Sequence, residues 1–244
     1  MSHTVRGNLT EHAYFLIRKR ILNGELPFGA NLSRRSLAEE LNISIVPVGD
    51  ALQKLETEGL VESRPRVGTR VRIPTAMAVR GHYLIREALE SQAARLFAEK
   101  ASHAERDEIK RMASQLDVLY LMVAPDASTS REQLFSTHEF HMRFHMRVAQ
   151  CTGCLELSQA IDKNQVLVFN WLYDSSLRDQ QSPANWHSEL ATALVAGDPE
   201  EADKAMRRHT SYRMQEVMQR LDSVVGTYEP RPEAFTRKRR SRNR

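Results

Sequence analysis

Four histidines in the C-terminal half of the chain are spaced in a way that could bind a metal ion. His141 and His145 are four residues apart, so in a helix they lie on one face. His187 and His209 follow in two later segments that also have helical periodicity. Imidazoles that converge from three helices can hold a divalent ion in the core of a bundle. Histidine pairs also occur on helix faces without any metal, so the spacing alone leaves both interpretations open.

The residues around this group offer no candidate for hydrolytic catalysis. A hydrolytic zinc site needs a general base beside the metal-bound water. His138 and Glu139 begin like the H-E-x-x-H motif, but Met142 stands where the second histidine would be. Glu139 also falls roughly opposite His141 around a helix. The sequence therefore predicts no catalytic residue.

Cys151 and Cys154 form a C-x-x-C sequence, which can be redox-active or bind a metal. Only one such pair is present, and no thioredoxin-like strand pattern surrounds it. We therefore expect a structural role for both cysteines. Two cysteines do not make a disulfide framework, which agrees with a reducing cytoplasm.

The segments that must position the histidines are almost entirely helical. Apolar residues recur at helical spacing through this part of the chain, and short polar or glycine-containing breaks separate the runs. Asp198 and Pro199, followed by two glutamates, are a strong start signal for the last helix. An all-α antiparallel bundle is predicted, with helices near 85–96, 109–123, 131–150, 155–177, 183–197 and from 198 onward.

The N-terminal stretch at 28–73 has the order helix, tight turn, helix and short hairpin. Ser33 and Ser44 are placed to cap the two helices, and Asn42 stands where a left-handed C-cap is needed. Gly59 ends the second helix, and two short strands then follow. A helix-turn-helix with a wing is a DNA-binding shape, and its second helix fits the major groove. A further helix, at 9–23, would support this unit from behind.

This stretch resembles the N-terminal winged helix of GntR-type bacterial transcription regulators. The resemblance rests on GELPFG at 24–29, LSRRSLA at 32–38, PV at 47–48, AL at 51–52, LE at 55–56, EGLV at 58–61 and VGT at 67–69. The family usually has DNA-contacting arginines where this chain has Ile45 and Gly49. An arginine bound to guanine contributes about 1–3 kcal/mol of base discrimination, so this departure predicts a changed sequence preference or weaker binding.

The helix-turn-helix and its resemblance indicate which residues contact DNA. Arg35 matches a DNA-contacting arginine of the family, and Ser44 and Lys54 flank the second helix, where phosphate contacts fix register. The wing adds basic residues and a glycine that lets the backbone approach DNA. The candidate DNA-binding residues are Arg34, Arg35, Ser44, Lys54, Arg64, Arg66, Gly68 and Thr69.

The helical part resembles the FCD ligand-binding domain, a common partner of the GntR winged helix. The matching pieces cover most of 80–222 and are REALE at 86–90, Phe144-His145 with Gly153, His187, AGD at 196–198 and His209. In that family an aspartate and three histidines bind a divalent metal. The resemblance implies His145, His187 and His209 as ligands, and the aspartate falls on His141.

Histidine in place of aspartate removes a negative charge and adds a softer ligand, which favours zinc or nickel over manganese. We expect zinc, with nickel as the alternative. Two other arrangements stay open. His141 could have lost the ligand role, or His138, about one turn earlier, could replace or support it.

In the FCD family the metal anchors a small organic acid through its carboxylate. Arg86 matches a family arginine and could bind such an acid bidentately, and Arg143 is a second candidate. The resemblance thus implies a small organic or sugar acid as effector. Arg86 could instead pair only with Glu90, four residues on.

Length and charge agree with two domains. The chain has 244 residues and a net charge of +4, and its last 18 residues hold seven basic and two acidic ones. No apolar run is long enough to span a membrane and no secretory segment is present, so a cytoplasmic location is expected. The expected division is a winged helix at 1–74, a linker at 75–80, a metal- and ligand-binding bundle at 81–224 and a basic tail at 225–244.

The sequence therefore predicts a mainly α, two-domain transcriptional repressor that binds a double-stranded DNA operator as a homodimer. A carboxylate metabolite bound at a histidine-ligated metal would control its operator affinity. Two alternatives remain: a metal-responsive regulator in which the ion itself is the effector, and a metal-dependent hydrolase that carries a DNA-binding domain.

Overall fold

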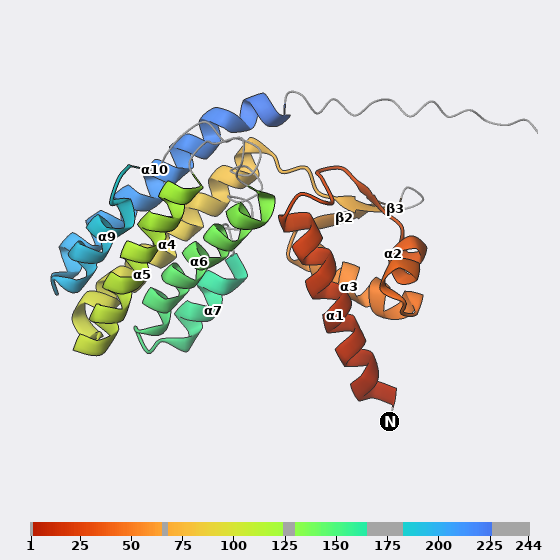
Figure 1. The fold of residues 1–244 in the computed structure, drawn as a ribbon, viewed down its shortest axis with the longest axis horizontal. Coiled ribbons are helices and arrows are strands. Elements are labelled where there is room, and N and C mark those ends of the chain that lie inside the picture. The colour runs from red at the N-terminus through yellow and green to blue at the C-terminus, as the bar shows by residue number, and fades with distance from the viewer. Residues whose placement is uncertain (1, 65–67, 124–129, 165–182, 226–244) are drawn as a thin grey trace, which may run out of the picture.

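The computed structural model describes residues 2–64, 68–123, 130–164 and 183–225. Arg66, the basic tail after residue 225 and the part of the expected helix beyond residue 164 lie outside these ranges. The predicted architecture is confirmed: a winged helix-turn-helix is followed by an all-helical domain (Figure 1). Within the described residues, none of the helices has the length and hydrophobicity needed to cross a membrane.

The winged-helix domain is built from three helices and a small sheet. The Ser33 side chain accepts a hydrogen bond from the Ser36 backbone N–H, and Asn42 adopts the left-handed conformation (φ 52°), so these two predicted caps form. Ser44 stands at the N-cap position of α3, but its side chain makes no capping hydrogen bond. The strand order is β1-β3-β2, with both pairs antiparallel. The elements are α1 (Ser2–Leu22), β1 (Asn31–Leu32), α2 (Arg34–Leu41), α3 (Ile45–Thr57), β2 (Val61–Arg64) and β3 (Gly68–Val71).

The inner faces of these elements make one apolar core. Ile17 and Ile21 of α1 pack against Val48 and Leu55 of α3, and Val71 of β3 closes the cluster. These five side chains are essentially fully buried. Their burial fixes the rotation of α3 about its own axis, and so decides which of its residues face solvent.

The C-terminal domain is a helical bundle. Its helices are α4 (Ala76–Lys100), α5 (His103–Met122), α6 (Arg131–Gln150), α7 (Leu155–Asn164), α9 (Trp186–Val195) and α10 (Pro199–Val225). Thr75 caps α4 by accepting a hydrogen bond from Ala78 N. Residues 76–80, which we expected to form a linker, therefore belong to the first bundle helix.

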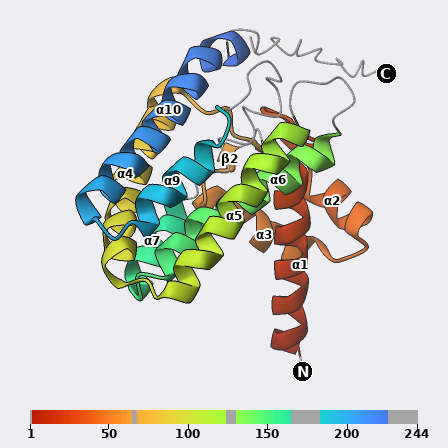
Figure 2. The same ribbon diagram turned by 60° about the vertical axis from the view of Figure 1, so that its left-hand side comes forward.

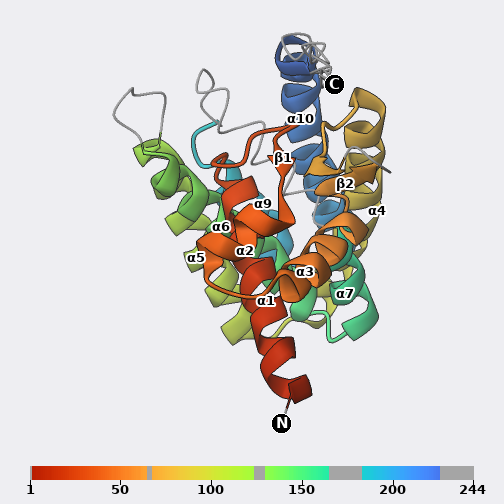
Figure 3. The same cartoon turned by 90° about the vertical axis from the view of Figure 1, so that its right-hand side faces the viewer.

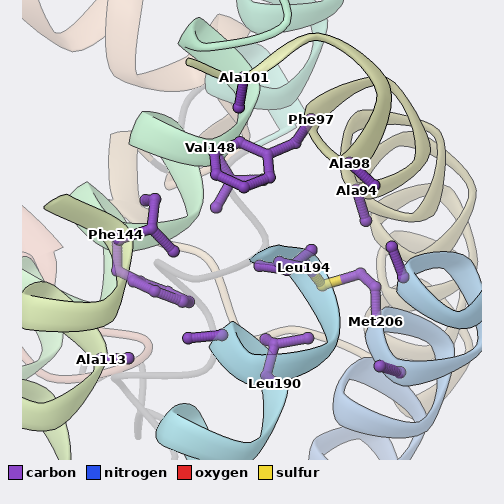
Figure 4. Close-up of a cluster of buried hydrophobic side chains, with 14 of the residues drawn as sticks. Ala94, Phe97, Ala98, Ala101, Ala113, Phe144, Val148, Leu190, Leu194 and Met206 are labelled. Atoms are coloured by element: carbon purple, nitrogen blue, oxygen red, sulfur yellow. The ribbon is translucent and has the colours of Figure 1, made fainter. Parts of the chain in front are cut away.

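The bundle core lies between α4, α5, α6, α9 and α10. Phe97, Phe144, Leu194 and Met206 are among its largest buried side chains, and alanines such as Ala94 let the helices approach closely (Figure 4). The long helices α4 and α10 run side by side in every view (Figures 1 and 3). Because Phe144 lies in this core, its neighbour His145 is held at the end of the same apolar cluster.

One bundle helix also packs against the winged-helix domain. Phe135 and Met142 of α6 pack against the core of the winged helix, and Figure 2 shows α6 beside α1. On the other side, Phe28 joins a small cluster with Val79 and Tyr83 of α4. The metal-binding candidates His141 and His145 therefore lie on a helix that contacts both domains.

Candidate metal centre and DNA-binding surface

Three of the four predicted metal ligands come together in the bundle. His141 and His145 project from α6 and His209 from α10, and one ring nitrogen from each lies within 4.8 Å of the others. All three residues are 2% exposed. Histidine ligands at this separation are of the right type for a first-row transition metal such as zinc.

Glu90 orients the ring of His145. The His145 Nδ1 atom lies 2.9 Å from Glu90 Oε2, and a proton on Nδ1 would leave the Nε2 lone pair facing the cluster. Arg86 Nη2 lies 3.4 Å from the same Nε2 and can donate to it. A carboxylate behind a ligating histidine is the usual arrangement at metal sites.

His141 is held by Tyr120 and faces His145. The Tyr120 hydroxyl lies 2.8 Å from His141 Nδ1, and the Nε2 atoms of His141 and His145 are 2.8 Å apart. A proton on His141 Nε2 makes this contact an N–H···N hydrogen bond, with the Tyr120 hydroxyl donating to Nδ1. A bound cation could take the place of that proton.

His187, on α9, adjoins the three-histidine group but is not one of the three. Its Nδ1 lies 2.8 Å from Asp117 Oδ1, and among the described residues its buried Nε2 has no hydrogen-bond partner. Its ring centroid is 4.8 Å from that of His141 and 5.2 Å from that of His209. Both ring nitrogens of His209 likewise lack a partner in the described parts of the chain, and its ring stacks on Trp186.

Burial keeps these imidazoles neutral. It lowers the pKa of His141 and His209 well below the ordinary value, and it lowers the pKa of His187 to about 4. It also lowers the pKa of His145, although the Glu90 carboxylate opposes this effect. Neutral imidazole is the form that ligates metals, so at pH 7 protons compete little for these nitrogens.

Arg86 and Glu90 form a buried ion pair next to the histidines. Arg86 Nε donates to Glu90 Oε1 at 2.9 Å, and both side chains are 3% exposed. Burial raises the pKa of Glu90, but the charge of Arg86 and the contacts that Arg86 and His145 make with the carboxylate outweigh it and bring the pKa to about 2. Arg86 Nη1 is buried and forms no hydrogen bond within the described residues, so one donor of the guanidinium remains available.

Arg143 and His138 lie apart from the cluster. Arg143 is exposed, and its guanidinium packs over the Phe140 ring at 5.0 Å from the centroid. His138 is buried, and its Nδ1 lies 3.5 Å from the Tyr120 hydroxyl. Arg86 is therefore the better placed of the two arginines for an acid bound at the histidines.

Sequence reasoning missed the residues that orient the ligands. Asp117 accepts hydrogen bonds from the backbone N–H groups of His187 and Ser188, each at 2.9 Å, as well as contacting the His187 ring. Tyr120 and Asp117 are three residues apart on α5, so they share one face. This spacing was the only sequence signal that Asp117 and Tyr120 act together. Their contact with the histidines depends on the packing of α5 against α6 and α9.

The C-x-x-C pair is two free thiols with different surroundings. Cys151 is buried at the end of α6, and burial raises the pKa of its thiol to about 12. Cys154 is half-buried, and its backbone N–H is hydrogen-bonded to Thr152 Oγ1. These surroundings are not those of a redox-active pair, which needs a thiolate near neutral pH.

In the native protein, iodoacetamide at pH 8 is expected to alkylate Cys154 while Cys151 stays unmodified. The thiolate is the reactive form, and at a pKa of about 12 Cys151 is ionised to roughly one part in ten thousand at that pH. Peptide mass spectrometry before and after urea unfolding measures both sites. Rapid native modification of Cys151, or a Cys151–Cys154 disulfide in air, would contradict this assignment.

The candidate DNA contacts gather around α3, with two departures. Arg34, Arg35, Ser44, Arg64 and Gly68 are exposed. Lys54 pairs with Glu11 and lies over the Tyr14 ring, on the side of α3 that faces α1. Thr69 is buried, and its hydroxyl lies 3.1 Å from Ser63 Oγ, so its side chain belongs to the sheet interior.

Arg35 and Arg64 each have a partner near the expected DNA surface. Arg35 Nε donates to Glu39 Oε1 at 3.0 Å, four residues on along α2. Arg64 lies 3.5 Å from Glu62 on β2. Both pairs are solvent-exposed and therefore weak, so phosphate oxygens can replace the carboxylates.

A hollow separates the start of α2 from α3 and the wing. It is lined by Arg34, Ile45, Val46, Gly49, Asp50, Leu52, Gln53, Glu56 and Ser63. The solvent-facing residues at the first turns of α3 form most of its floor. This is the part of a second helix that meets base edges in helix-turn-helix proteins.

Comparison with known proteins gives the class. Residues 9–71 match the model of the gntR family of bacterial regulatory proteins, and residues 82–212 match the FCD domain. The chain is 32% identical to the probable D-xylose utilization operon transcriptional repressor of Paenarthrobacter nicotinovorans, over 78% of this chain and 80% of that one. It is 25% identical to the HTH-type transcriptional repressor RspR of Escherichia coli K12, over 86% and 90% respectively.

A solved structure has the same fold. The crystal structure of a GntR transcriptional regulator from Rhodococcus sp. RHA1 superposes with a TM-score of 0.67 at 20% identity, covering 90% of this chain and 99% of that one. The winged helix and the helical domain together define a DNA-binding transcriptional regulator. The chain belongs to the gntR family, in the group that carries an FCD domain.

Proposed function

We propose that this regulator is a repressor whose operator affinity is set by a small organic or sugar acid, bound at a zinc ion in the bundle. The three-histidine cluster beside Arg86 carries the proposal. His141, His145 and His209 would hold the ion, with His187 as a fourth ligand that Asp117 orients. The ion would supply a Lewis acid site for a carboxylate.

Arg86 supplies the second half of the proposed acid site. Its Nη1 has no partner among the described residues. The hydrogen bond from its Nε to Glu90 fixes the orientation of the guanidinium, and so the direction in which Nη1 can donate. A guanidinium edge and a metal ion a few ångströms apart can bind the two ends of a hydroxy acid. This combination favours an acid over a neutral sugar.

The surroundings of the cluster argue against hydrolysis. Of the described carboxylates, Glu90 contacts His145 and is paired with Arg86, and Asp117 is engaged by His187 and Ser188. A carboxylate held this way orients ligands and cannot at the same time take a proton from a metal-bound water. The cluster is therefore suited to binding rather than turnover.

The acid would act through the two helices that reach the winged helix. Arg86 lies on α4, which begins five residues after β3 ends, and His141 and His145 lie on α6, which packs Phe135 and Met142 against the winged-helix core. A ligand that pulls α4 and α6 together would change how the winged helix is held. Operator affinity changes if the two arrangements bind the acid differently.

We also propose that the protein works as a homodimer joined through α4. Met77, Leu84 and Ile85 are 84%, 54% and 50% exposed and lie on one face of that helix. Ile85→Glu is expected to give a monomer, because a second copy would bury this face and a buried, unpaired carboxylate opposes association. Light scattering gives the mass, and Leu155→Glu, at an exposed leucine of α7, is the matched control that should stay dimeric.

The function is tested by selecting genomic fragments of the source organism with the purified protein at physiological salt. A few enriched sites with dyad symmetry are expected, and a panel of hydroxy acids and sugar acids should release them only when zinc is present. His145→Ala should bind the same sites but no longer respond, whereas His103→Ala, at an exposed histidine of α5, should respond normally. Release by zinc alone would favour the metal-responsive alternative, and diffuse, salt-sensitive retention would reject a specific operator.

A further inference from the structure

The outward face of α3 is apolar at the end that meets DNA. Ile45 and Val46 are the first two residues of the helix, and they are 51% and 53% exposed. Their exposure follows from the packing of the opposite face, since Val48 and Leu55 are buried in the core and fix the rotation of the helix. Two adjacent branched aliphatic side chains therefore stand in solvent at a position where DNA-binding proteins usually place polar groups.

The positive charge at this surface comes from the neighbouring helix. Lys54 is the one basic residue of α3, and it is paired with Glu11 on the other side of the helix. Gly49, one turn after Ile45, has no side chain, and a Cβ there would lie 3.9 Å from Arg34 Nη1. The Arg34 guanidinium from α2 thus lies by the hollow near Gly49, whereas the charged residues that α3 itself contributes to the hollow are the carboxylates Asp50 and Glu56.

Exposed aliphatic side chains can read only an apolar feature of DNA. In the major groove that feature is the C5-methyl group of thymine, because the other base-edge groups are hydrogen-bond donors or acceptors. The N-terminal residues of a recognition helix are the ones that reach base edges. We infer that Ile45 and Val46 read thymine methyl groups in each operator half-site. This inference rests on the proposed function, because it assigns the bases that the operator-binding surface prefers.

The test replaces thymine with uracil in the enriched operator. Uracil pairs in the same way but lacks the methyl group, so only the apolar contact is removed. One such substitution in each half-site, at the position that α3 covers, is expected to weaken binding roughly fourfold per methyl group, the effect of exposing one buried methyl. Fluorescence anisotropy with the thymine and uracil duplexes gives the affinity ratio.

Variants of Ile45 and Val46 show whether these two side chains make the contact with the thymine methyl group. In Ile45→Ala/Val46→Ala the thymine-to-uracil ratio should fall to about one, whereas Leu155→Ala on α7 should keep the ratio of the unaltered protein. Both positions of the double variant are half-exposed, so the fold is expected to stay intact, and circular dichroism checks this.

The outcomes separate the two levels of the proposal. If no sequence is enriched, the proposed function fails and the inference fails with it. If operators are enriched but bind equally well with uracil at every position in the half-site, the inference is wrong and the regulator reads its site otherwise. A uracil effect that persists in Ile45→Ala/Val46→Ala also overturns it, since the methyl group would then act through DNA shape.

Discussion

Replacing His145 with alanine is expected to lower the zinc affinity of the protein by at least about 100-fold. The His145 Nε2 atom lies 2.8 Å from His141 Nε2, and the His145 ring is 5.2 Å from that of His209, so the substitution removes one of the three grouped ligands. Loss of even an outer-sphere partner at a metal site usually reduces affinity 10- to 100-fold, and loss of a ligand should do more. Competition with a fluorescent zinc chelator measures the affinity.

Two controls make this result specific. His103→Ala removes an exposed histidine of α5 and should leave zinc affinity unchanged. Asp117→Asn keeps the size of the side chain that orients His187, and an effect of about 10- to 100-fold would indicate that His187 is a ligand. If His145→Ala is folded and still binds zinc at the original affinity, the histidine cluster is not the metal centre.

Glu90→Leu is expected to destabilise the bundle by about 3–5 kcal/mol. The substitution leaves the Arg86 guanidinium buried without its carboxylate, and breaking one half of a buried ion pair has an effect of this size. The double variant Arg86→Met/Glu90→Leu should recover most of the loss, because two apolar side chains can replace a buried pair. Urea unfolding followed by tryptophan fluorescence gives the free energies.

Comparing Glu90→Leu with a surface variant and with the double variant separates the effect on stability from the effect on ligand binding. Glu200→Leu breaks the solvent-exposed contact with Arg95 and should change the transition far less than Glu90→Leu does. The double variant should be stable yet unresponsive to any acid, since it lacks Arg86. A stable Glu90→Leu single variant would mean that water or a ligand, rather than Glu90, satisfies the guanidinium.

Local chemistry made much of the fold predictable. The caps at Ser33 and Asn42 and the apolar spacing of α3 determine the helix-turn-helix without help from distant residues. Strand β1 was not predicted, because Asn31 and Leu32 are too few to show alternation and form a strand only by pairing with β3. The start of α4 was also missed, because a polar Thr75 directly after Pro74 is typical of a linker when only the sequence is considered.

The site was predictable only in part. His141 and His145 share a helix face by spacing alone, but the arrival of His209 from α10 followed from family resemblance. Their partners Glu90 and Tyr120 come from helices whose packing no local pattern reveals.

On the DNA side, the interpretation of two residues depended on tertiary contacts. Thr69 looked like a wing contact, yet strand pairing places it inside the sheet beside Ser63. Lys54 was expected to contact phosphate, and in the structure α1 brings Glu11 to it. The sequence predicts the surroundings of a side chain when they come from its own helix or strand. It does not predict them when a second element supplies the neighbours.

Helix α6 contacts both the winged-helix core and the histidine cluster, so events at one of these sites should affect the other. Met142 packs on the winged-helix core, while its neighbour His141 faces the three-histidine cluster, so a shift of the helix moves both contacts. If zinc and an acid bind as proposed, thermodynamic linkage requires that operator DNA change the affinity for them by the same factor by which they change the affinity for DNA. A short operator duplex should therefore act as an effector of the metal site, and chelator competition with and without DNA would measure how strongly.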